Sequence, residues 1–277
     1  MAGRGSGPDF VESLARGLDV LRAFDQHHRA MSLGDVASAT GLARPTARRL
    51  LLTLEELGYV RSLDGTFSLT PKVITLVTAY VASLGLWEVA RPHLEALVKQ
   101  TGESSSMAQL DGSDIIYVAR VSVPKIIAPR VDIGTRFPAP QTSQGKVLLA
   151  ALSSDEVDEV LTIPSRSGLP RYIGRSRESL DDELTQVRAR GWALADEELA
   201  PGVRSVAVPV RDGTGTVRAP MNVTVHAAET STEHLLDAHL PRLLRTAGDV
   251  SADWATWQAR PHHEAHPVVE DDASSGR

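Results

Sequence analysis

The stretch ATGLARPTARRLLLTLEELGYV, residues 39–60, decides the fold of the N-terminal part of the chain, because it gathers three arginines around a proline where a helix begins. Pro45 suits the first helical position, since its φ angle is already helical and its missing N–H would have no partner there. Proline also disfavours a helical conformation in the preceding residue, so we expect Arg44 to be the N-cap. An apolar face follows at helical spacing, opposite Arg48 and Arg49. That face consists of Ala47, Leu50, Leu51, Leu54 and Leu57.

Two further helices are predicted before this one. The segment SLARGLDVLRAFD, residues 13–25, has the spacing of an amphipathic helix. Its expected core face is Leu14, Leu18, Leu21 and Phe24. The segment SLGDVASATG, residues 32–41, predicts a short helix that Ser32 caps, with Asp35 completing a capping box and Gly41 ending the helix.

A hairpin is predicted after the third helix. Beyond Gly58 the apolar pattern has a period of two, and Asp64-Gly65 suits the tip of a hairpin. Three helices followed by a hairpin form a winged helix-turn-helix, whose third helix enters the major groove of DNA. Positive charge is needed only where that helix meets DNA, which explains the three arginines in a chain of formal net charge −6 and pI about 5.9.

The recognition helix and the wing supply the predicted DNA contacts. We expect Arg44 and one of Arg48 or Arg49 to contact phosphate or guanine, and Thr46 to reach a base or the backbone. Arg61 on the wing could touch a flanking phosphate. The complete predicted set is Ser32, Arg44, Pro45, Thr46, Arg48, Arg49 and Arg61. The alternative is a solvated helix face on which the arginines pair with the glutamates near the end of the same helix.

Composition excludes several other classes of protein. A chain of 277 residues with 42% hydrophobic residues is long enough for two domains. There is no cysteine, which excludes disulfides and thiol nucleophiles and suits a reducing cytosol. The N-terminus lacks the apolar segment of a signal peptide, and the longest uncharged run, residues 73–87, is too short and too polar to cross a membrane. We therefore expect a cytoplasmic protein without membrane contact.

The chain is expected to divide at changes of composition. Residues 1–9 and 256–277 are polar and read as disordered, and the HHEAH of the tail lacks metal-ligand spacing, so no metal site is predicted. Residues 10–71 form the winged helix-turn-helix. The long apolar segment 72–85 is interpreted as a linker helix that packs on a partner chain, with a core helix of the second domain as the alternative. Residues 86–255 form the second domain.

The second domain alternates helix and strand signals. Helices are predicted at 86–102, 142–151, 178–190 and 232–250, and strands at 203–210, at 216–226 and on both sides of Asp111-Gly112. Strands in hairpins with helices around them indicate an α+β domain on an antiparallel sheet. This domain contains no nucleophile elbow (GxSxG), no dinucleotide fingerprint (GxGxxG) after a strand and no HExxH motif, so we predict neither an enzyme nor a cofactor.

One segment of this domain resembles a phosphate loop without being one. In TSQGKV, residues 142–147, Val147 stands where the motif needs Ser or Thr, and Pro140 replaces its first glycine. Thr142 and Ser143 instead suit a helix N-cap. The free N–H groups at such a helix start are a ready site for a carboxylate.

From Phe10 to about Val250 the chain resembles transcriptional regulators of the IclR family. The resemblance rests on SLARGLDVLRAF, TGLARPTARRLLLTLEELGYV, LTPKVITL, TSQGKVLLA and GWALADEELAPGVRSVAVPVRD, in this order and spacing. The segments GESSSMAQLDGSDIIYVARV and IGTRFPAP further resemble the branch whose members regulate protocatechuate, 4-hydroxybenzoate and β-ketoadipate catabolism.

The resemblance implies a homodimer or dimer of dimers that binds double-stranded operator DNA with palindromic sequence. It also implies a GAF-like C-terminal domain that holds a small carboxylate effector such as protocatechuate, 4-hydroxybenzoate or β-ketoadipate. The implied effector residues are Ile126, Phe137, Ser143, Gln144, Val203, Ser205, Asn222 and Thr224. Amide and hydroxyl donors suit a carboxylate and apolar side chains suit a ring. The alternative is that Ser205, Asn222 and Thr224 are ordinary strand residues facing solvent.

An arginine could also bind the acid, because a guanidinium matches a carboxylate in two parallel hydrogen bonds. Of Arg120, Arg136 and Arg204, we select Arg136. Two prolines depart from the family pattern: Pro140 precedes the helix start, and Pro220 falls inside the expected last strand, where proline removes a ladder hydrogen bond.

Two other functions remain as alternatives. One is an enzyme with a GAF-like domain and an accessory helix-turn-helix. The other is an adaptor whose winged helix binds protein. Within the regulator interpretation, the sequence leaves open repression or activation, the operator sequence and the identity of the effector.

Overall fold

The computed structural model describes residues 7, 9–25, 28–76, 85–124, 131–169 and 176–259. The chain divides into two compact units, residues 1–84 and 85–277. Most of the two termini predicted to be disordered, and most of the predicted linker helix, lie outside the described residues. The described start of that linker is the short helix η1, Pro71–Val73. No helix in the described ranges is long and apolar enough to cross a membrane.

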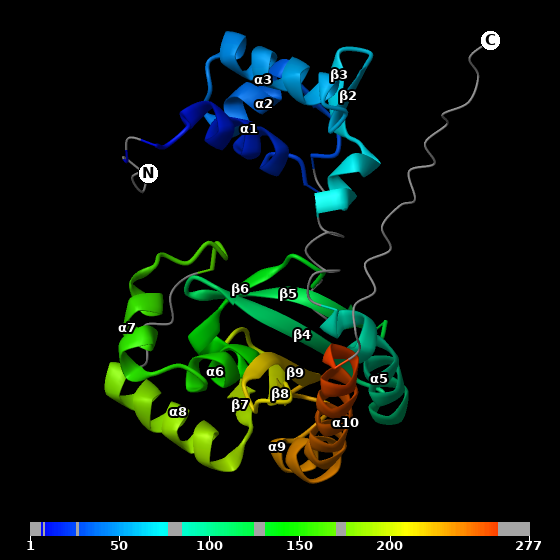
Figure 1. Cartoon of the computed structure of the whole chain (residues 1–277), viewed down its shortest axis with the longest axis vertical. Coiled ribbons are helices and arrows are strands. Elements are labelled where there is room, and N and C mark those ends of the chain that lie inside the picture. Colours follow the sequence, from blue (N-terminus) through cyan, green and yellow to red (C-terminus); the bar gives the residue numbers. More distant parts are fainter. Residues whose placement is uncertain are drawn as a thin grey trace, which may run out of the picture. The chain divides into compact units, whose positions relative to one another are not determined.

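The first unit is the predicted winged helix-turn-helix (Figure 1). Its helices are α1 (Glu12–Arg22), α2 (Leu33–Thr40) and α3 (Arg44–Glu56), and the wing consists of β2 (Val60–Leu63) and β3 (Thr66–Leu69). Asp64 and Gly65 form the hairpin tip with φ angles of 49° and 78°, as a two-residue turn with left-handed backbone requires. A strand that the sequence did not reveal, β1 (Met31–Ser32), pairs with β3 in the order β1-β3-β2.

The core of this unit differs from the prediction on α1. Val20 is fully buried, whereas Leu14 and Leu18 are 64% and 43% exposed. The apolar arc of α1 is wider than the stripe that α2 and α3 cover. Val20 of α1 and Phe24, two residues after the helix ends, belong to the core. On α3, Leu51 and Leu54 are buried as predicted. The predicted core face of α1 is therefore wrong at its first two positions, which stay exposed in this unit.

The start of α3 is shifted by one residue from the prediction. Ala43 is the N-cap, with extended φ and ψ of −61° and 139°, and Arg44 is already helical. The carbonyl of Ala43 accepts the first helical hydrogen bond from the Ala47 N–H at 3.0 Å. Pro45 consequently takes the second position, where its missing N–H again costs nothing. The restriction that proline imposes on Arg44 disfavoured the helical conformation but did not prevent it.

The second unit is built on an antiparallel sheet, which confirms the α+β class. Within its described residues the strand order is β6-β5-β4-β9-β8-β7, and every neighbouring pair is antiparallel. The bounds are β4 Ser104–Asp111, β5 Asp114–Val121, β6 Arg136–Pro138, β7 Ala193–Asp196, β8 Val203–Arg211 and β9 Val217–His226. The short strands β6 and β7 were not predicted.

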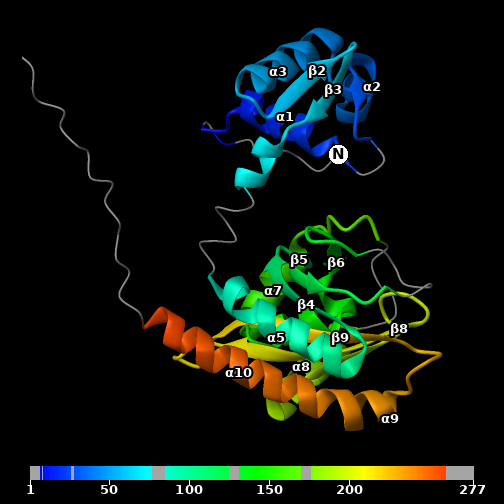
Figure 2. The ribbon, with the colours of Figure 1, turned by 90° about the vertical axis from the view of Figure 1, so that its right-hand side faces the viewer.

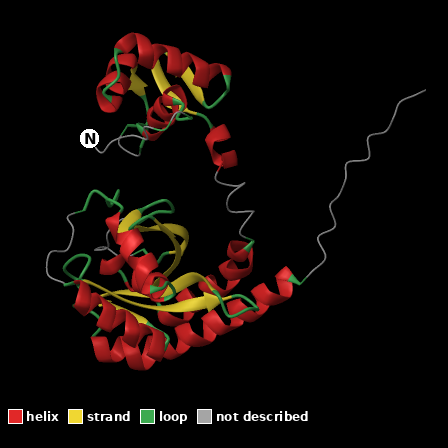
Figure 3. Ribbon diagram, turned by 60° about the vertical axis from the view of Figure 1, so that its left-hand side comes forward, coloured by secondary structure: helices red, strands yellow, loops and turns green. Residues whose placement is uncertain are grey.

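Helices cover both faces of this sheet (Figures 2 and 3). On one face, α5 (Leu86–Thr101) and α10 (Leu240–Gln258) share a core with β8 and β9. On the other face, α6 (Ser143–Ala150), α7 (Ser154–Thr162) and α8 (Arg177–Arg190) pack around a second core. A short α9 (Thr232–His234) continues through a π-helical turn, η3 (Leu235–His239), into α10. The sequence did not reveal α7, and α10 continues past the predicted end at 250.

The proline inside the last strand is accommodated by the sheet. Pro220 of β9 lies opposite Pro209 of β8, and the residues of β9 that pair with β4 begin at Met221, directly after Pro220. A bulge in the β4–β5 ladder between Met107 and Ala108 lies at the same level. Because β4 pairs with residues 221–224 of β9 and not with Pro220, the missing N–H breaks no rung of that ladder.

Candidate functional site

The outer side of α3 is an exposed basic surface. Arg44, Pro45, Arg48 and Arg49 are exposed, and Thr46 is half-buried. None of the carboxylates in the described part of the chain pairs with these three arginines. The alternative of arginines neutralised by glutamates of the same helix is therefore not observed. A basic surface without intramolecular partners suits contact with phosphate and base edges.

The acidic end of α3 is used by the wing. Glu55 Oε1 accepts hydrogen bonds from the N–H and the hydroxyl of Ser62, at 2.9 and 2.5 Å. Arg61, on β2, is exposed, and its Nε donates to Ser68 Oγ at 3.2 Å. These contacts fix the wing against α3 and leave most of the Arg61 guanidinium for a partner.

Ser32 and Arg44 are the predicted residues with a second role. The hydroxyl of Ser32 accepts from the Asp35 N–H at 3.2 Å, and Asp35 Oδ2 accepts from the Ser32 N–H at 2.9 Å, which is the predicted capping box of α2. A Cβ atom at Gly34 would lie 2.8 Å from Arg44 Nη2, so the guanidinium rests on the first turn of α2. Glycine at position 34 thus leaves room for the Arg44 side chain, on α3, to pack against the first turn of α2.

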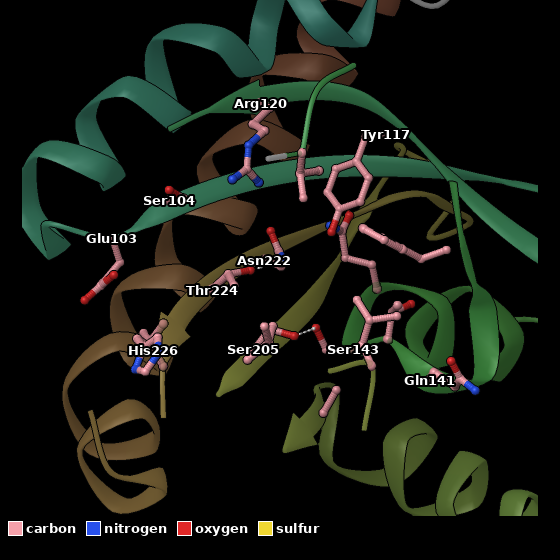
Figure 4. Close-up of a pocket in the computed structure, with 18 of the residues that line it drawn as sticks. Glu103, Ser104, Tyr117, Arg120, Gln141, Ser143, Ser205, Asn222, Thr224 and His226 are labelled. Carbon is pink, nitrogen blue, oxygen red and sulfur yellow. Dashed lines mark hydrogen bonds between the residues drawn. The ribbon is translucent and has the colours of Figure 1, made fainter. Parts of the chain in front are cut away.

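The second unit contains a cavity of about 80 Å³ between its sheet and the start of α6. The ladder registers place Ser106 between Arg120 and Asn222, and Thr224 between Ser104 and Ser205. Paired residues in adjacent strands share one face of a sheet, so these polar side chains form two rows beneath the cavity. Figure 4 shows Arg120 and Tyr117 pointing into the hollow from β5, with Asn222, Thr224 and Ser205 across it.

The start of α6 presents hydrogen-bond donors to this cavity. Thr142 is the N-cap, and its Oγ1 accepts from the Gly145 N–H at 3.0 Å. The N–H groups of Ser143 and Gln144 have no acceptor among the described residues. The side chain of Gln144 is 1% exposed, and neither its Oε1 nor its Nε2 has a partner in the described part of the chain. Unsatisfied buried donors of this kind indicate a place for a ligand oxygen.

The glycine and lysine of the TSQGKV segment have structural roles. A Cβ atom at Gly145 would lie 2.0 Å from the carbonyl oxygen of Ala139, so only glycine lets α6 approach the turn η2 (Ala139–Gln141). Lys146 is fully buried, and its Nζ donates to Glu183 Oε1, Glu198 Oε1 and the Leu194 carbonyl at 2.8, 2.5 and 2.8 Å. The lysine is thus held on the side away from the cavity, which agrees with the absence of a phosphate loop.

An aromatic wall closes one side of the cavity. The rings of Tyr117 and Phe137 meet edge to face, with centroids 5.8 Å apart. Burial raises the pKa of the Tyr117 phenol above its usual value, with smaller opposing effects from the Arg120 charge and the Gln144 side chain. The phenol is therefore neutral at physiological pH and can donate a hydrogen bond.

Most of the predicted effector residues meet in this one cavity. It is lined by Phe137, Ser143, Gln144, Val203, Ser205, Asn222 and Thr224. Ser205 and Asn222 are 8% and 2% exposed, so the alternative that they face solvent is wrong. Asn222 is already satisfied, since Oδ1 accepts from the Ser106 N–H and Nδ2 donates to Thr224 Oγ1, both at 2.9 Å. Ile126 lies outside the described residues.

Arg136 is a correction to the prediction. It pairs with Asp111, and its Nη1 lies 3.9 Å from Asp114 Oδ2, so it does not line the cavity. The cause is strand alternation, because Phe137 points into the cavity and its neighbour on β6 must then point away. Arg204 pairs with Asp196. The arginine at the cavity is Arg120. The sequence could not single it out, because Val118 is an extra, unpaired residue in β5 and shifts the alternation between Tyr117 and Arg120, so that both side chains reach the cavity.

The first unit is a winged helix-turn-helix whose third helix carries arginines without carboxylate partners among the described residues. The second unit encloses a cavity lined by hydrogen-bond donors. These two features define a DNA-binding regulator with an effector domain. Residues 13–64 match the IclR helix-turn-helix domain, and residues 78–252 match the bacterial transcriptional regulator IclR C-terminal domain. The chain belongs to the IclR family of transcriptional regulators.

Named relatives agree with this assignment. The Pca regulon regulatory protein of Pseudomonas putida is 40% identical over 247 residues, which cover 88% of this chain and 84% of that protein. The p-hydroxybenzoate hydroxylase transcriptional activator of Acinetobacter baylyi is 32% identical, covering 87% of this chain and 91% of that protein. These relatives are regulators rather than enzymes, which confirms the prediction that the chain is not an enzyme.

Solved structures share the fold. A crystal structure from Rhodococcus sp. RHA1, described as a transcriptional regulator, has a TM-score of 0.78 and 47% identity, covering 90% of this chain and all (100%) of that one. An IclR homolog from Microbacterium hydrocarbonoxydans, crystallised with 4-hydroxybenzoate, has a TM-score of 0.76 and 24% identity, covering 88% and 100% of the two chains. The second likeness supports the fold alone.

Proposed function

We propose that this regulator controls a catabolic operon for aromatic acids by binding a palindromic operator, with an affinity that a small carboxylate effector changes. The observation that carries the proposal is the cavity at the start of α6. The N–H groups of Ser143 and Gln144 have no acceptor among the described residues, and both residues line this cavity together with Tyr117 and Phe137. The relatives named for the pca regulon and for p-hydroxybenzoate hydroxylase support aromatic catabolism as the pathway.

The cavity fits an aromatic or similarly small acid for physical reasons. Amide N–H groups at a helix start and the hydroxyls of Ser143 and Ser205, whose oxygens lie 2.7 Å apart, can surround a carboxylate. Tyr117 and Phe137 offer apolar surface to a ring or a short carbon chain. We include protocatechuate, 4-hydroxybenzoate and β-ketoadipate as the effector set.

Assembly as a homodimer or dimer of dimers is part of the proposal. A recognition helix reads one half-site, and a palindrome matches the two-fold symmetry of a dimer. The first unit also exposes neighbouring apolar side chains near its N-terminus, among them Val11 at 57%, Leu14 at 64% and Leu18 at 43%. Such a patch on a regulator supports a contact with a second copy. Effector binding would then shift the population of dimers between two arrangements of the recognition helices.

The effector is tested by thermal unfolding of the purified protein with each acid. An effector at 100 times its Kd should add about 2.7 kcal/mol to the free energy of unfolding and raise the midpoint. Ser143→Trp fills the cavity and should remove the rise. Ser154→Trp, at the same helical position of α7 but exposed, is the matched control and should retain it. If none of the acids stabilises the unmodified protein, the proposed effector class is wrong.

A further inference from the structure

The cavity of the second unit contains an arginine, Arg120, that forms no ion pair with any carboxylate of the described residues. Arg120 lies on β5 directly opposite Ser106, and its Nη1 donates to Ser106 Oγ at 3.0 Å. That bond uses one of the five donors of the guanidinium. Arg120 Nε is buried and has no partner in the described residues, and no described group accepts from Nη2. The Nε–Nη2 edge is therefore available inside the cavity.

Arg120 differs from two other arginines, Arg136 and Arg204, in having no carboxylate partner among the described residues. Three arginines lie close to the cavity in sequence, and two of them are paired: Arg136 with Asp111, and Arg204 with Asp196 at 2.6 Å. No described carboxylate forms an ion pair with Arg120. A half-buried guanidinium loses part of its hydration, and without an anion no ion pair offsets this cost. Burial accordingly lowers the pKa of Arg120, with smaller opposing effects from Tyr117 and Asp132.

The surroundings of Arg120 can complete a site for an acid group. The buried side-chain amide of Gln144 has no hydrogen-bond partner among the described residues, and Tyr117 offers a neutral hydroxyl. The Nε–Nη2 edge of an arginine matches the two oxygens of a carboxylate in parallel hydrogen bonds. A neutral hydroxyl or amide presents a weaker acceptor to the same edge. The geometry therefore favours an ionised group at this position.

We propose that Arg120 forms an ion pair with a carboxylate of the effector and is the residue that selects acids over their neutral isosteres. This inference rests on the proposed function, since it needs an acid in the cavity. The carboxylate has two possible sources. It is either the only acid group of an aromatic acid, whose ring hydroxyl then meets the start of α6, or the second acid group of a diacid whose first one binds there.

The test combines a change in the protein with a matched change in the ligand. Isothermal titration measures Kd for 4-hydroxybenzoate and 4-hydroxybenzamide, and for adipate and its monomethyl ester, on the full-length protein. The variants are Arg120→Gln and, as a matched control on the neighbouring strand, Arg136→Gln. Arg120→Lys keeps the charge but not the two-pronged edge. Circular dichroism and the thermal midpoint without ligand establish that each variant is folded.

The unmodified protein should bind the acid of one pair about 30-fold or more tightly than the amide or half-ester that lacks one carboxylate, because removing one partner of a desolvated charge pair is costly. In Arg120→Gln this ratio should fall below about 5-fold, through loss of acid binding rather than gain of neutral binding. Arg120→Lys should lie between the two, and Arg136→Gln should keep the full ratio. Selectivity within the hydroxybenzoate pair identifies a monoacid, and selectivity within the adipate pair identifies a diacid.

Three results would overturn the inference, and they separate it from the proposed function. If Arg120→Gln weakens acid and neutral ligand equally, Arg120 only supports the fold. If Arg136→Gln reduces the ratio as much as Arg120→Gln, the effect is general electrostatics. Both of these results leave the proposed effector class intact. If the unmodified protein binds none of the four compounds, the effector class and the role of Arg120 fail together.

Discussion

At the scale of single residues, the arginines of α3 are distinguished by the absence of carboxylate partners among the described residues. Arg48 and Arg49 are exposed and have no carboxylate partner among the described residues, whereas the glutamate nearest to the wing is already bonded to Ser62. Arginines without intramolecular partners lose little when they move to a phosphate or a guanine. Their availability for DNA is therefore a property of the folded unit and not only of its sequence.

Replacing both arginines by alanine should abolish specific operator binding. Two lost contacts at about 1–3 kcal/mol each correspond to at least a 30-fold weaker Kd, and the slope of log K against log salt should become less steep by about 2. Fluorescence anisotropy with labelled operator at several salt concentrations measures both. Arg242→Ala with Arg245→Ala, on exposed positions of α10, is the matched control and should change neither. Binding that survives with an unchanged slope would favour the protein-adaptor alternative.

At the scale of elements, α6 links the cavity to the rest of the second unit. Its first turn faces the cavity, and one turn later Lys146 is bonded to Glu183 of α8 and to Glu198, which directly precedes the cavity residue Leu199. The lysine is fully buried, and the two glutamate side chains are 17% and 14% exposed. This buried ion cluster positions the helix start and the loop that borders the cavity.

Lys146→Met should destabilise the protein more than removal of the whole charge cluster does. Deleting one partner of a buried ion pair costs about 3–5 kcal/mol, because it leaves the other charge buried without compensation. The triple variant Lys146→Met, Glu183→Gln, Glu198→Gln removes all three charges and should recover much of that loss. Urea unfolding followed by circular dichroism compares them. Equal stability of the single and triple variants would mean that packing, rather than charge, makes the lysine necessary.

Local sequence signals predicted most of the helices and both kinds of hairpin turn. Which side chains reach the cavity depends on the register between strands, which these signals do not contain. Caps and turn residues, such as Ser32 with Asp35 and Asp64-Gly65, act within a few residues, so sequence alone located these elements. The choice between Arg120 and Arg136 depended on the bulge at Val118 of β5 and on which face of the sheet each β6 side chain occupies. Those features arise from pairing between distant segments, which a local pattern does not contain.

The core of the first unit shows the same limit. The apolar arc of α1 suggested Leu14 and Leu18 as core, but packing against α2 and α3 buries Val20 instead. An amphipathic pattern shows that a helix has an apolar side, without showing which part of that side its own domain covers. The part of the apolar arc that stays exposed, at Leu14 and Leu18, is available to a partner chain.

At the scale of the whole molecule, we expect the exposed leucines of α1, Leu14 and Leu18, to form the dimer contact that lets two recognition helices bind one palindromic operator. Leu14→Asp with Leu18→Asp places charge in an apolar contact, so the sedimenting species should shift toward smaller mass in analytical ultracentrifugation. Affinity for a full palindromic operator should fall to about that for a single half-site, because the second contact no longer follows from the first. Leu244→Asp, at a leucine of α10 that is 44% exposed, is the control and should retain both properties. A double variant that keeps its mass and its preference for the full operator would show that the dimer forms through other surfaces.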